Sequence, residues 1–269
     1  GARVGRGTSD GGGLEREGRH RGALAGRRGV LCAGAGRGAA PRPVPVDRRG
    51  RQGGDGLCAV LPARAAAEEV PAGTAVLYTH SDEDHLGRRT AQALAGAAFY
   101  GPAPCARALS EIGREAERVI RPGEKFAVGC IGIEAIPADH GWQSMDVKKY
   151  GAPFGPEDCV GYILRTPHAK LLFPGDTRRM PQHRALPDDF DAMAFDVSAD
   201  PWHMGARDGA ELARHLSRAK LLPCPFGTYD APEAVPHNGS LILAREALGD
   251  AAARLASDAI GAAVIFGAE

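Results

Sequence analysis

Residues 80–85 of this chain, His80-Ser81-Asp82-Glu83-Asp84-His85, place five candidate metal ligands within six positions. They follow the short apolar run 75–78 and precede Leu86-Gly87, a pattern typical of a β-strand that ends in a loop. Three carboxylates in so short a stretch repel one another, and a bound cation would offset that repulsion. Imidazole combined with carboxylate suits Zn, Mn or Fe better than Ca or Mg. The alternative is an exposed acidic turn that carries two histidines by chance.

Three later strand-like segments also end at candidate ligands. Residues 133–136 lead to Asp139-His140, residues 171–173 lead to Gly175-Asp176-Thr177, and residues 221–222 lead to a loop that contains Cys224 and Asp230. Each segment has an ordinary explanation, because a loop histidine can bond to backbone and an aspartate can cap its own turn. Loops held by a rigid scaffold are nevertheless where functional residues gather. Their order after residues 80–85 favours the interpretation of His140 and Asp176 as ligands.

The elements that must position these residues alternate from about residue 70 onward. We expect strands at 74–78, 98–100, 118–120, 125–128, 130–136, 159–166, 170–173, 191–197 and 220–223. We expect helices at 88–97, 106–114 and 206–219, and one long final helix at 240–256. Antiparallel pairs followed by strand–helix alternation predict a layered α/β domain with mixed sheets.

The segment 1–65 differs in composition from the rest of the chain. Gly, Ala and Arg dominate it, no aromatic residue precedes Tyr78, and no sustained apolar period precedes about Val60. Such a segment buries too little apolar surface to offset its ordering entropy, so we expect it to be disordered or poorly packed and to supply no strand. An Arg/Gly-rich nucleic-acid tail and a reading-frame error in a GC-rich gene are the alternatives. The expected division is therefore 1–65 and a folded domain at 66–269.

Composition limits the classes of partner. A hydrophobic content of 43% allows a sizeable core, and a net charge of zero gives no electrostatic case for nucleic acid or an anionic membrane. No apolar run approaches the ~20 residues that span a bilayer, and no signal-peptide pattern is present, so a cytoplasmic location is expected. The six cysteines form no C-x-x-C pair, which argues against a zinc ribbon. The expected partner is a small-molecule substrate, with anionic ones included, and the oligomeric state stays open.

These motifs resemble those of the metallo-β-lactamase-fold hydrolases. The family signature is H-x-H-x-D-H after a strand, a lone His, a bridging Asp in G-D-T or G-D-S, and a final His; this chain matches it at His80, Asp84, His85, His140 and Asp176. Within the family the chain is most similar to the L-ascorbate-6-phosphate lactonase-like group, through residues 79–86, 101–105, 121–124, 175–178 and 200–203. From about residue 70 onward, the resemblance implies an αββα sandwich, expected here with an incomplete N-terminal half.

Two positions depart from that signature. Asp82 stands where the family has its second His, which makes the site harder and favours Mn or Fe. The final His is expected just after residues 221–222, where this chain has Cys224-Pro225-Phe226, and a proline cannot coordinate a metal. Cys224, Asp230 and His237 are the alternative ligands. Without that ligand the second metal would bind more weakly, so a mononuclear or inactive site stays open.

The resemblance implies one or two divalent metal ions, Zn or Mn, with Fe as a further option. The implied ligands of one metal are His80, Asp82 and His140. Asp84 and His85 would hold the other metal, and Asp176 would bridge the two.

The implied reaction is attack of a metal-bound hydroxide on an ester, lactone or phosphodiester. Asp84 would be the catalytic residue that orients the water and carries its proton. His203, with Trp202, and His237 are candidate substrate contacts, and for the 202–203 pair the alternative is a packed turn. Arg178 and Arg179 could meet an anionic substrate.

The function predicted from sequence is thus a metal-dependent hydrolase. The main alternative is a degenerate, non-catalytic member of the same fold that acts as a binding or scaffold protein. A third option is the oxygen or nitric oxide chemistry of flavodiiron proteins, but those need a flavin domain for which this chain has no room.

Overall fold

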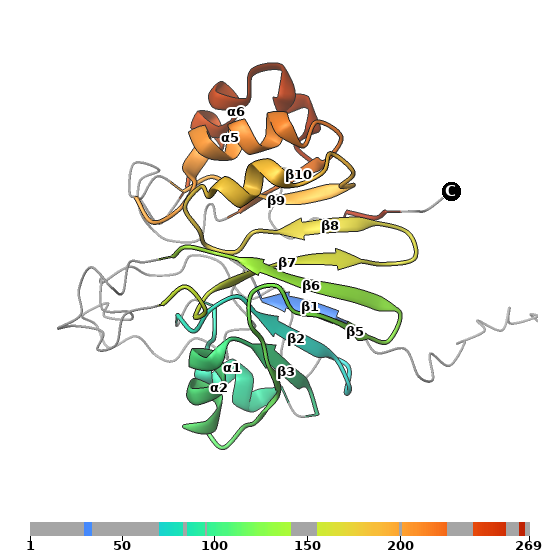
Figure 1. Ribbon diagram of the computed structural model, residues 1–269, viewed down its shortest axis with the longest axis vertical. Coiled ribbons are helices and arrows are strands. Elements are labelled where there is room, and N and C mark those ends of the chain that lie inside the picture. Colours follow the sequence, from blue (N-terminus) through green and yellow to red (C-terminus); the bar gives the residue numbers. More distant parts are fainter. Residues whose placement is uncertain are drawn as a thin grey trace, which may run out of the picture.

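The computed structural model describes residues 30–33, 70–82, 85–94, 96–140, 155–198, 201–224, 239–256 and 264–266, with only the backbone described for 30–33. Two β-sheets lie face to face, and helices cover the outer face of each sheet (Figure 1). This arrangement is the αββα sandwich that the sequence predicts.

The first sheet is wholly parallel in the described residues, with strand order β1-β2-β3-β4. Its strands are β1 (Val30–Ala33), β2 (Ala75–Tyr78), β3 (Ala98–Gly101) and β4 (Ala116–Val119). Parallel neighbours need crossover connections, and helices make them between β2 and β3 and between β3 and β4. The crossover helices are α1 (Arg88–Ala93) and α2 (Ala103–Ser110).

The second sheet is mixed, with strand order β10-β9-β8-β7-β6-β5. Neighbours from β5 to β8 are antiparallel, whereas β8, β9 and β10 are parallel. Its strands are β5 (Lys125–Val128), β6 (Ile131–Pro137), β7 (Val160–Arg165), β8 (Lys170–Phe173), β9 (Ala192–Asp196) and β10 (Lys220–Cys224). Its outer helices are α5 (Gly205–His215) and α6 (Leu241–Leu248), with 3-10 helices at Pro181–Ala185 and Gly249–Arg254.

The core forms three layers that follow from strand alternation. In β2, Ala75 and Leu77 pack between the sheets, while Val76 and Tyr78 pack against α1 and α2. The layer between the sheets also contains Tyr162 of β7, whose hydroxyl donates to the Tyr78 carbonyl at 2.8 Å. A third layer, with Phe195 at its centre, lies between the second sheet and helices α5 and α6. The buried apolar faces on both sides of β2 explain why its sequence is continuously apolar.

The structure corrects the expectations at two ends of the chain. Strand β1 lies inside the segment that was expected to supply no strand, and it pairs in parallel with β2. Its four residues lie in a stretch dominated by Gly, Ala and Arg, so no sustained apolar period surrounds them. The expected single helix at 240–256 instead ends at Leu248, because Gly249 adopts φ +57° and the chain continues as a 3-10 helix.

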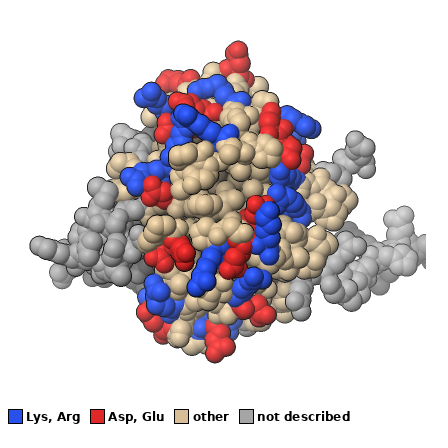
Figure 2. All heavy atoms as spheres, in the orientation of Figure 1, with Lys and Arg blue, Asp and Glu red and all other residues tan. Residues whose placement is uncertain are grey.

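Positive and negative side chains are interspersed on the visible face of the molecule, in keeping with the net charge of zero (Figure 2). None of the helices in the described residues is long and apolar enough to cross a bilayer.

Candidate metal centre

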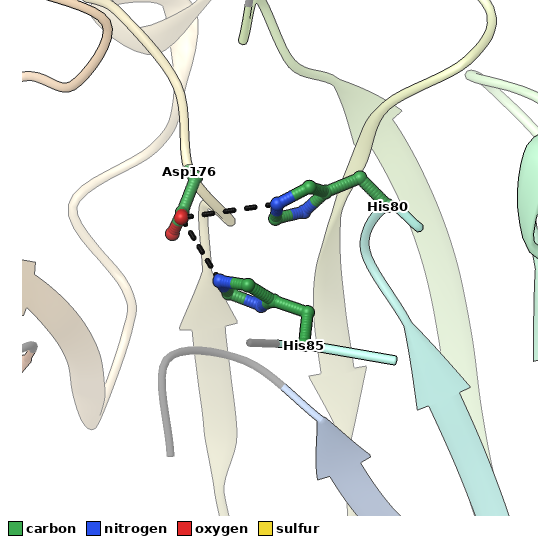
Figure 3. A group of neighbouring side chains, drawn as sticks. All are labelled: His80, His85 and Asp176. Atoms are coloured by element: carbon green, nitrogen blue, oxygen red, sulfur yellow. Dashed lines mark hydrogen bonds and ion pairs between the residues drawn. The ribbon is translucent and has the colours of Figure 1, made fainter. Parts of the chain in front are cut away.

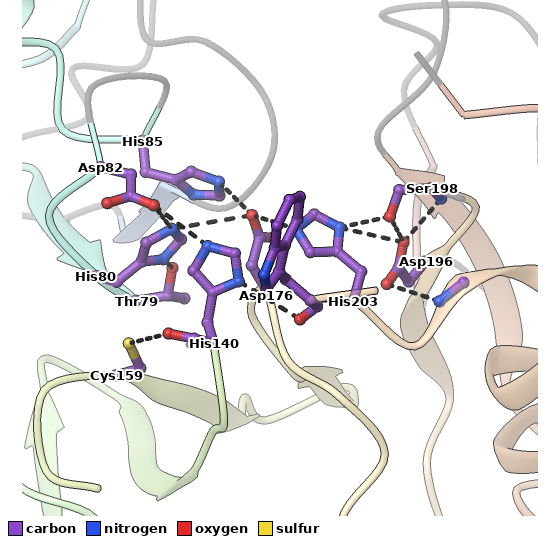
Figure 4. Close-up of polar contacts among 12 residues, drawn as sticks. Thr79, His80, Asp82, His85, His140, Cys159, Asp176, Asp196, Ser198 and His203 are labelled. Carbon is purple, nitrogen blue, oxygen red and sulfur yellow. Dashed lines mark hydrogen bonds and ion pairs between the residues drawn. The ribbon is translucent and has the colours of Figure 1, made fainter. Parts of the chain in front are cut away.

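The candidate ligands come from strand ends of both sheets. His80, Asp82 and His85 follow β2 in the first sheet, whereas His140 follows β6 and Asp176 follows β8 in the second. Because β6, β8 and β9 run in the same direction, their carboxyl ends meet at one edge of that sheet. That edge lies beside the end of β2, so side chains from both sheets converge there (Figure 4).

Imidazole nitrogens surround two carboxylate oxygens. The Nε2 atoms of His80 and His140 lie 3.5 and 3.2 Å from Asp82 Oδ2. The Nε2 atoms of His80 and His85 lie 3.8 and 2.9 Å from Asp176 Oδ2 (Figure 3). The Nε2 atom of His80 therefore lies between the two carboxylates.

Three overlapping sets of ligand atoms lie within 4.8 Å of one another in the described residues. The sets are His80 with His85 and Asp176, His80 with Asp82 and His140, and His140 with Asp176 and His203. Shared members make these sets one continuous centre.

Hydrogen bonds at Nδ1 orient the rings. The carbonyl of Trp202 lies 3.5 Å from His140 Nδ1, and since a carbonyl only accepts, this nitrogen donates. The Thr79 hydroxyl lies 2.9 Å from His80 Nδ1 and can accept in the same way. A proton on Nδ1 leaves the Nε2 lone pair facing the carboxylates, which is the tautomer that binds a metal through Nε2.

Burial and neighbouring charge shape the protonation states of the centre. Burial, reinforced by the nearby His85 ring, holds the pKa of His80 well below its ordinary value, so His80 is neutral. Burial alone would raise the pKa of Asp176, but His85 and His203 outweigh it and hold that pKa well below the usual range. The centre therefore combines a neutral imidazole with an ionised carboxylate.

This set of donors fits a divalent metal. Imidazole nitrogen and carboxylate oxygen are the donors that Zn, Mn and Fe share, and the side chains of His80, Asp82, His85 and His140 are each at most 5% exposed. The ionised carboxylate supplies a negative charge whose burial a cation would offset.

The structure brings five of the predicted ligands together: His80, Asp82, His85, His140 and Asp176. Two other predicted site residues, Asp84 and His237, lie outside the described residues, as does Asp230. The assignment of these residues as ligands, and of Asp84 as the catalytic residue, stays a prediction.

Three residues take places that sequence reasoning did not give them. His203, predicted as a substrate contact, lies with Nε2 3.2 Å from Asp176 Oδ2. Asp196 and Ser198, which had not been singled out, lie behind the His203 ring (Figure 4). One feature of the sequence could have indicated these residues: β9, like β8, is followed closely by polar residues at its carboxyl end.

The remaining candidates from the sequence are Cys224, Arg178 and Arg179. Cys224 belongs to none of the ligand sets found in the described residues, and burial, followed by the charge of Asp176, raises the pKa of its thiol. Arg178 binds Asp139 with two nitrogens at 3.0 and 3.1 Å, and Arg179 pairs with Glu211. Both arginines therefore have carboxylate partners within the protein.

Comparison with known proteins identifies the family. Residues 50–224 match the family model described as beta-lactamase superfamily domain, which is more than half of the chain. The chain belongs to the β-lactamase superfamily. No curated protein matches it.

Solved structures show that this β-lactamase superfamily member has the fold of metallo-hydrolases. An isothiocyanate hydrolase from Delia radicum gut bacteria has a TM-score of 0.61 and 18% identity over 78% of this chain and 82% of its own. A protein from Parabacteroides distasonis named as a metal-dependent hydrolase has a TM-score of 0.51 and 23% identity over 70% and 77% of the two chains. A protein from Veillonella parvula, also named as a metal-dependent hydrolase, has a TM-score of 0.53 and 16% identity over 71% of this chain and 73% of its own.

Proposed function

We propose that this β-lactamase superfamily member is a metal-dependent hydrolase that acts on an ester, a lactone or a phosphodiester. The observation that carries the proposal is the convergence of imidazole nitrogens from both sheets on the Oδ2 atoms of Asp82 and Asp176. A degenerate scaffold protein would have no need to keep this many buried polar groups together, because their desolvation is costly without a cation.

The proposed ligands divide into two positions. His80, Asp82 and His140 would hold one metal, and Asp84 and His85 would contribute to the other. Asp176 would serve both, since its Oδ2 lies 3.8 Å from His80 Nε2 and 2.9 Å from His85 Nε2. A divalent metal here supplies Lewis acidity, which lowers the pKa of a water ligand toward ~7 and polarises the substrate oxygen on which charge develops.

The protein's own residues hold and orient the reacting groups. The Thr79 hydroxyl and the Trp202 carbonyl fix the rings of His80 and His140 with Nε2 toward the centre. A bound cation would keep Asp176 ionised, because a nearby positive charge favours the charged form of a carboxyl group. Asp84 is assigned by the family signature to orient the attacking water and to accept its proton.

The finer assignment rests on sequence motifs. Residues 101–105, 121–124 and 200–203 support the lactonase-like branch. Asp82 in place of a histidine makes the ligand set harder, which favours Mn or Fe over Zn.

The test begins with the full chain stripped by a chelator and reconstituted with Zn or Mn, followed by elemental analysis. Hydrolysis is then measured with bis(p-nitrophenyl) phosphate, p-nitrophenyl acetate and a lactone panel. We expect about two metals per chain and hydrolysis of at least one substrate, abolished by His80→Ala and by Asp84→Ala. His168→Ala, which removes an exposed histidine outside the centre, is the matched control. A reconstituted protein without bound metal, or full activity in His80→Ala, would contradict the proposal.

A further inference from the structure

The feature that goes beyond the proposed function is His203, which reaches the centre from an unexpected loop. The family signature expects its final His after β10, where this chain has Cys224-Pro225-Phe226. His203 instead lies between β9 and α5, and its Nε2 is 3.2 Å from Asp176 Oδ2. Its ring centroid is 5.2 Å from that of His140.

His203 lies as close to neighbouring ligand atoms as the other candidate ligands do. One ligand atom each from His140, Asp176 and His203 lies within 4.8 Å of the other two. His203 shares the carboxylate oxygen Asp176 Oδ2 with His80 and His85, so three imidazoles surround one oxygen atom. His203 belongs to the ligand set of His140 and Asp176, whereas His80 and His85 share a different set with Asp176.

A chain of hydrogen bonds orients the His203 ring. The Ser198 hydroxyl donates to Asp196 Oδ1 at 2.5 Å, and this leaves its oxygen free to accept from the adjacent Nδ1 of His203. Asp196 Oδ1 itself lies 3.7 Å from that Nδ1. With Nδ1 donating on this side, the other ring nitrogen, Nε2, faces Asp176 and the centre. A carboxylate behind a histidine is the arrangement that commonly supports metal-bound imidazole.

The backbone around His203 is built to hold this loop at the end of β9. The amide of Gly205 donates to Asp196 Oδ2 at 3.2 Å, and the amide of Ser198 donates to Asp196 Oδ1 at 2.9 Å. Gly205 adopts φ +64°, and a Cβ there would lie 2.9 Å from the Ser198 carbonyl oxygen. Only glycine combines this conformation with this close approach, so Gly205 lets the loop turn back against Ser198.

No other described side chain takes the place of the missing ligand on this side of the centre. The chain has nine histidines, of which His20 and His237 lie outside the described residues. Of the described ones, His183 accepts from the Met180 amide and His215 binds the Leu186 carbonyl. Cys224 is in none of the ligand sets found there.

We propose that His203 is a metal ligand that takes the place of the missing final histidine, and that Asp196 and Ser198 are the positioning residues that orient it. This inference rests on the proposed metal-dependent function. It names an imidazole ligand that the family signature places elsewhere, in one ligand set with His140 and Asp176.

The test measures metal binding directly, by elemental analysis and by competition with a chromophoric chelator, using Zn and Mn. In His203→Ala we expect one metal fewer per chain, or a dissociation constant for the weaker metal raised by more than ~100-fold. In Ser198→Ala the His203 ring keeps Nε2 but loses the hydrogen bond that orients it. We therefore expect the same number of metals per chain and a metal affinity that is ~10-fold lower. His168→Ala, with an exposed histidine, is expected to match the wild type.

The outcomes separate this inference from the proposed function. Wild-type protein that takes up no metal overturns both. Wild-type protein that takes up metal, with unchanged stoichiometry and affinity in His203→Ala, overturns only the role of His203. A raised KM with unchanged metal binding would make His203 a substrate contact instead and likewise overturns it. If His203→Ala fails to fold, Ser198→Ala decides, and unaltered metal affinity in that variant counts against the proposal.

Discussion

A buried histidine outside the centre gives a quantitative prediction about stability and pH. His183 lies in the 3-10 helix Pro181–Ala185 and is 2% exposed. Its Nδ1 accepts a hydrogen bond from the Met180 amide at 3.1 Å, so the ring is neutral with its proton on Nε2. Burial, and next the charge of Arg179, lowers the pKa of His183 from 6.5 to about 4.

The direction of the effect follows from the two pKa values. In the unfolded chain His183 takes up a proton as pH falls through 6.5, whereas in the folded protein it does so only near pH 4. The stability that the neutral buried ring allows is therefore fully present above pH 6.5 and is lost as pH falls from 6.5 to 4. With these values, the loss between pH 7 and pH 5 is about 2 kcal/mol.

The assay is urea unfolding of the metal-free protein at pH 7 and pH 5, with excess chelator throughout. In His183→Asn the Oδ1 atom can accept from the Met180 amide in place of Nδ1, but nothing titrates at that position. We expect the stability difference between the two pH values to be smaller in His183→Asn than in the wild type by about 2 kcal/mol. His168→Asn serves as the control because it removes an exposed histidine. Parallel pH dependence of wild type and His183→Asn would refute the reasoning that burial keeps this ring neutral.

Three further predictions concern the loops that carry the candidate ligands. Gly205→Ala introduces a Cβ 2.9 Å from the Ser198 carbonyl oxygen at φ +64° and should cost at least ~2 kcal/mol of unfolding free energy, measured in urea. Thr177→Val removes a buried hydroxyl that accepts from the Asp139 amide at 2.8 Å and donates to the Arg178 carbonyl at 2.9 Å. We expect it to lower the free energy of unfolding by ~1–3 kcal/mol and to weaken metal binding, whereas Thr177→Ser should keep the metal affinity. Arg178→Ala breaks an ion pair in which both side chains are about half exposed, so its thermal unfolding should change by the equivalent of no more than ~1 kcal/mol.

Apolar runs made most of the fold predictable from sequence. Every expected strand from residue 74 onward is present within a few residues of its expected bounds, because most of these strands bury an apolar face between layers. Helix α2 begins at Ala103, earlier than expected at 106, because Pro104 lies in its first turn, where a missing amide proton has no cost. Strand β1 and the break at Gly249 were missed, since Val30–Ala33 lies in a stretch dominated by Gly, Ala and Arg, and a single positive φ leaves no periodic trace.

The candidate site was predictable in part. The order of the motifs along the sequence predicts that His80, His85, His140 and Asp176 are neighbours, and these side chains do converge. The position of His203 could not be predicted from motif order, because it depends on contacts with Ser198 and Asp196 and on the course of a loop. Spacing along the chain records which residues follow a strand, but not how the loop folds back.

The division of the candidate ligands between the two sheets has a consequence for folding. Two of the three ligand sets combine side chains from both halves: His80 and His85 with Asp176, and His80 and Asp82 with His140. A cation bound here would act as a cross-link whose formation requires that the halves have already docked. Metal uptake at these two sets would then report, in real time during refolding, the moment at which the two halves meet.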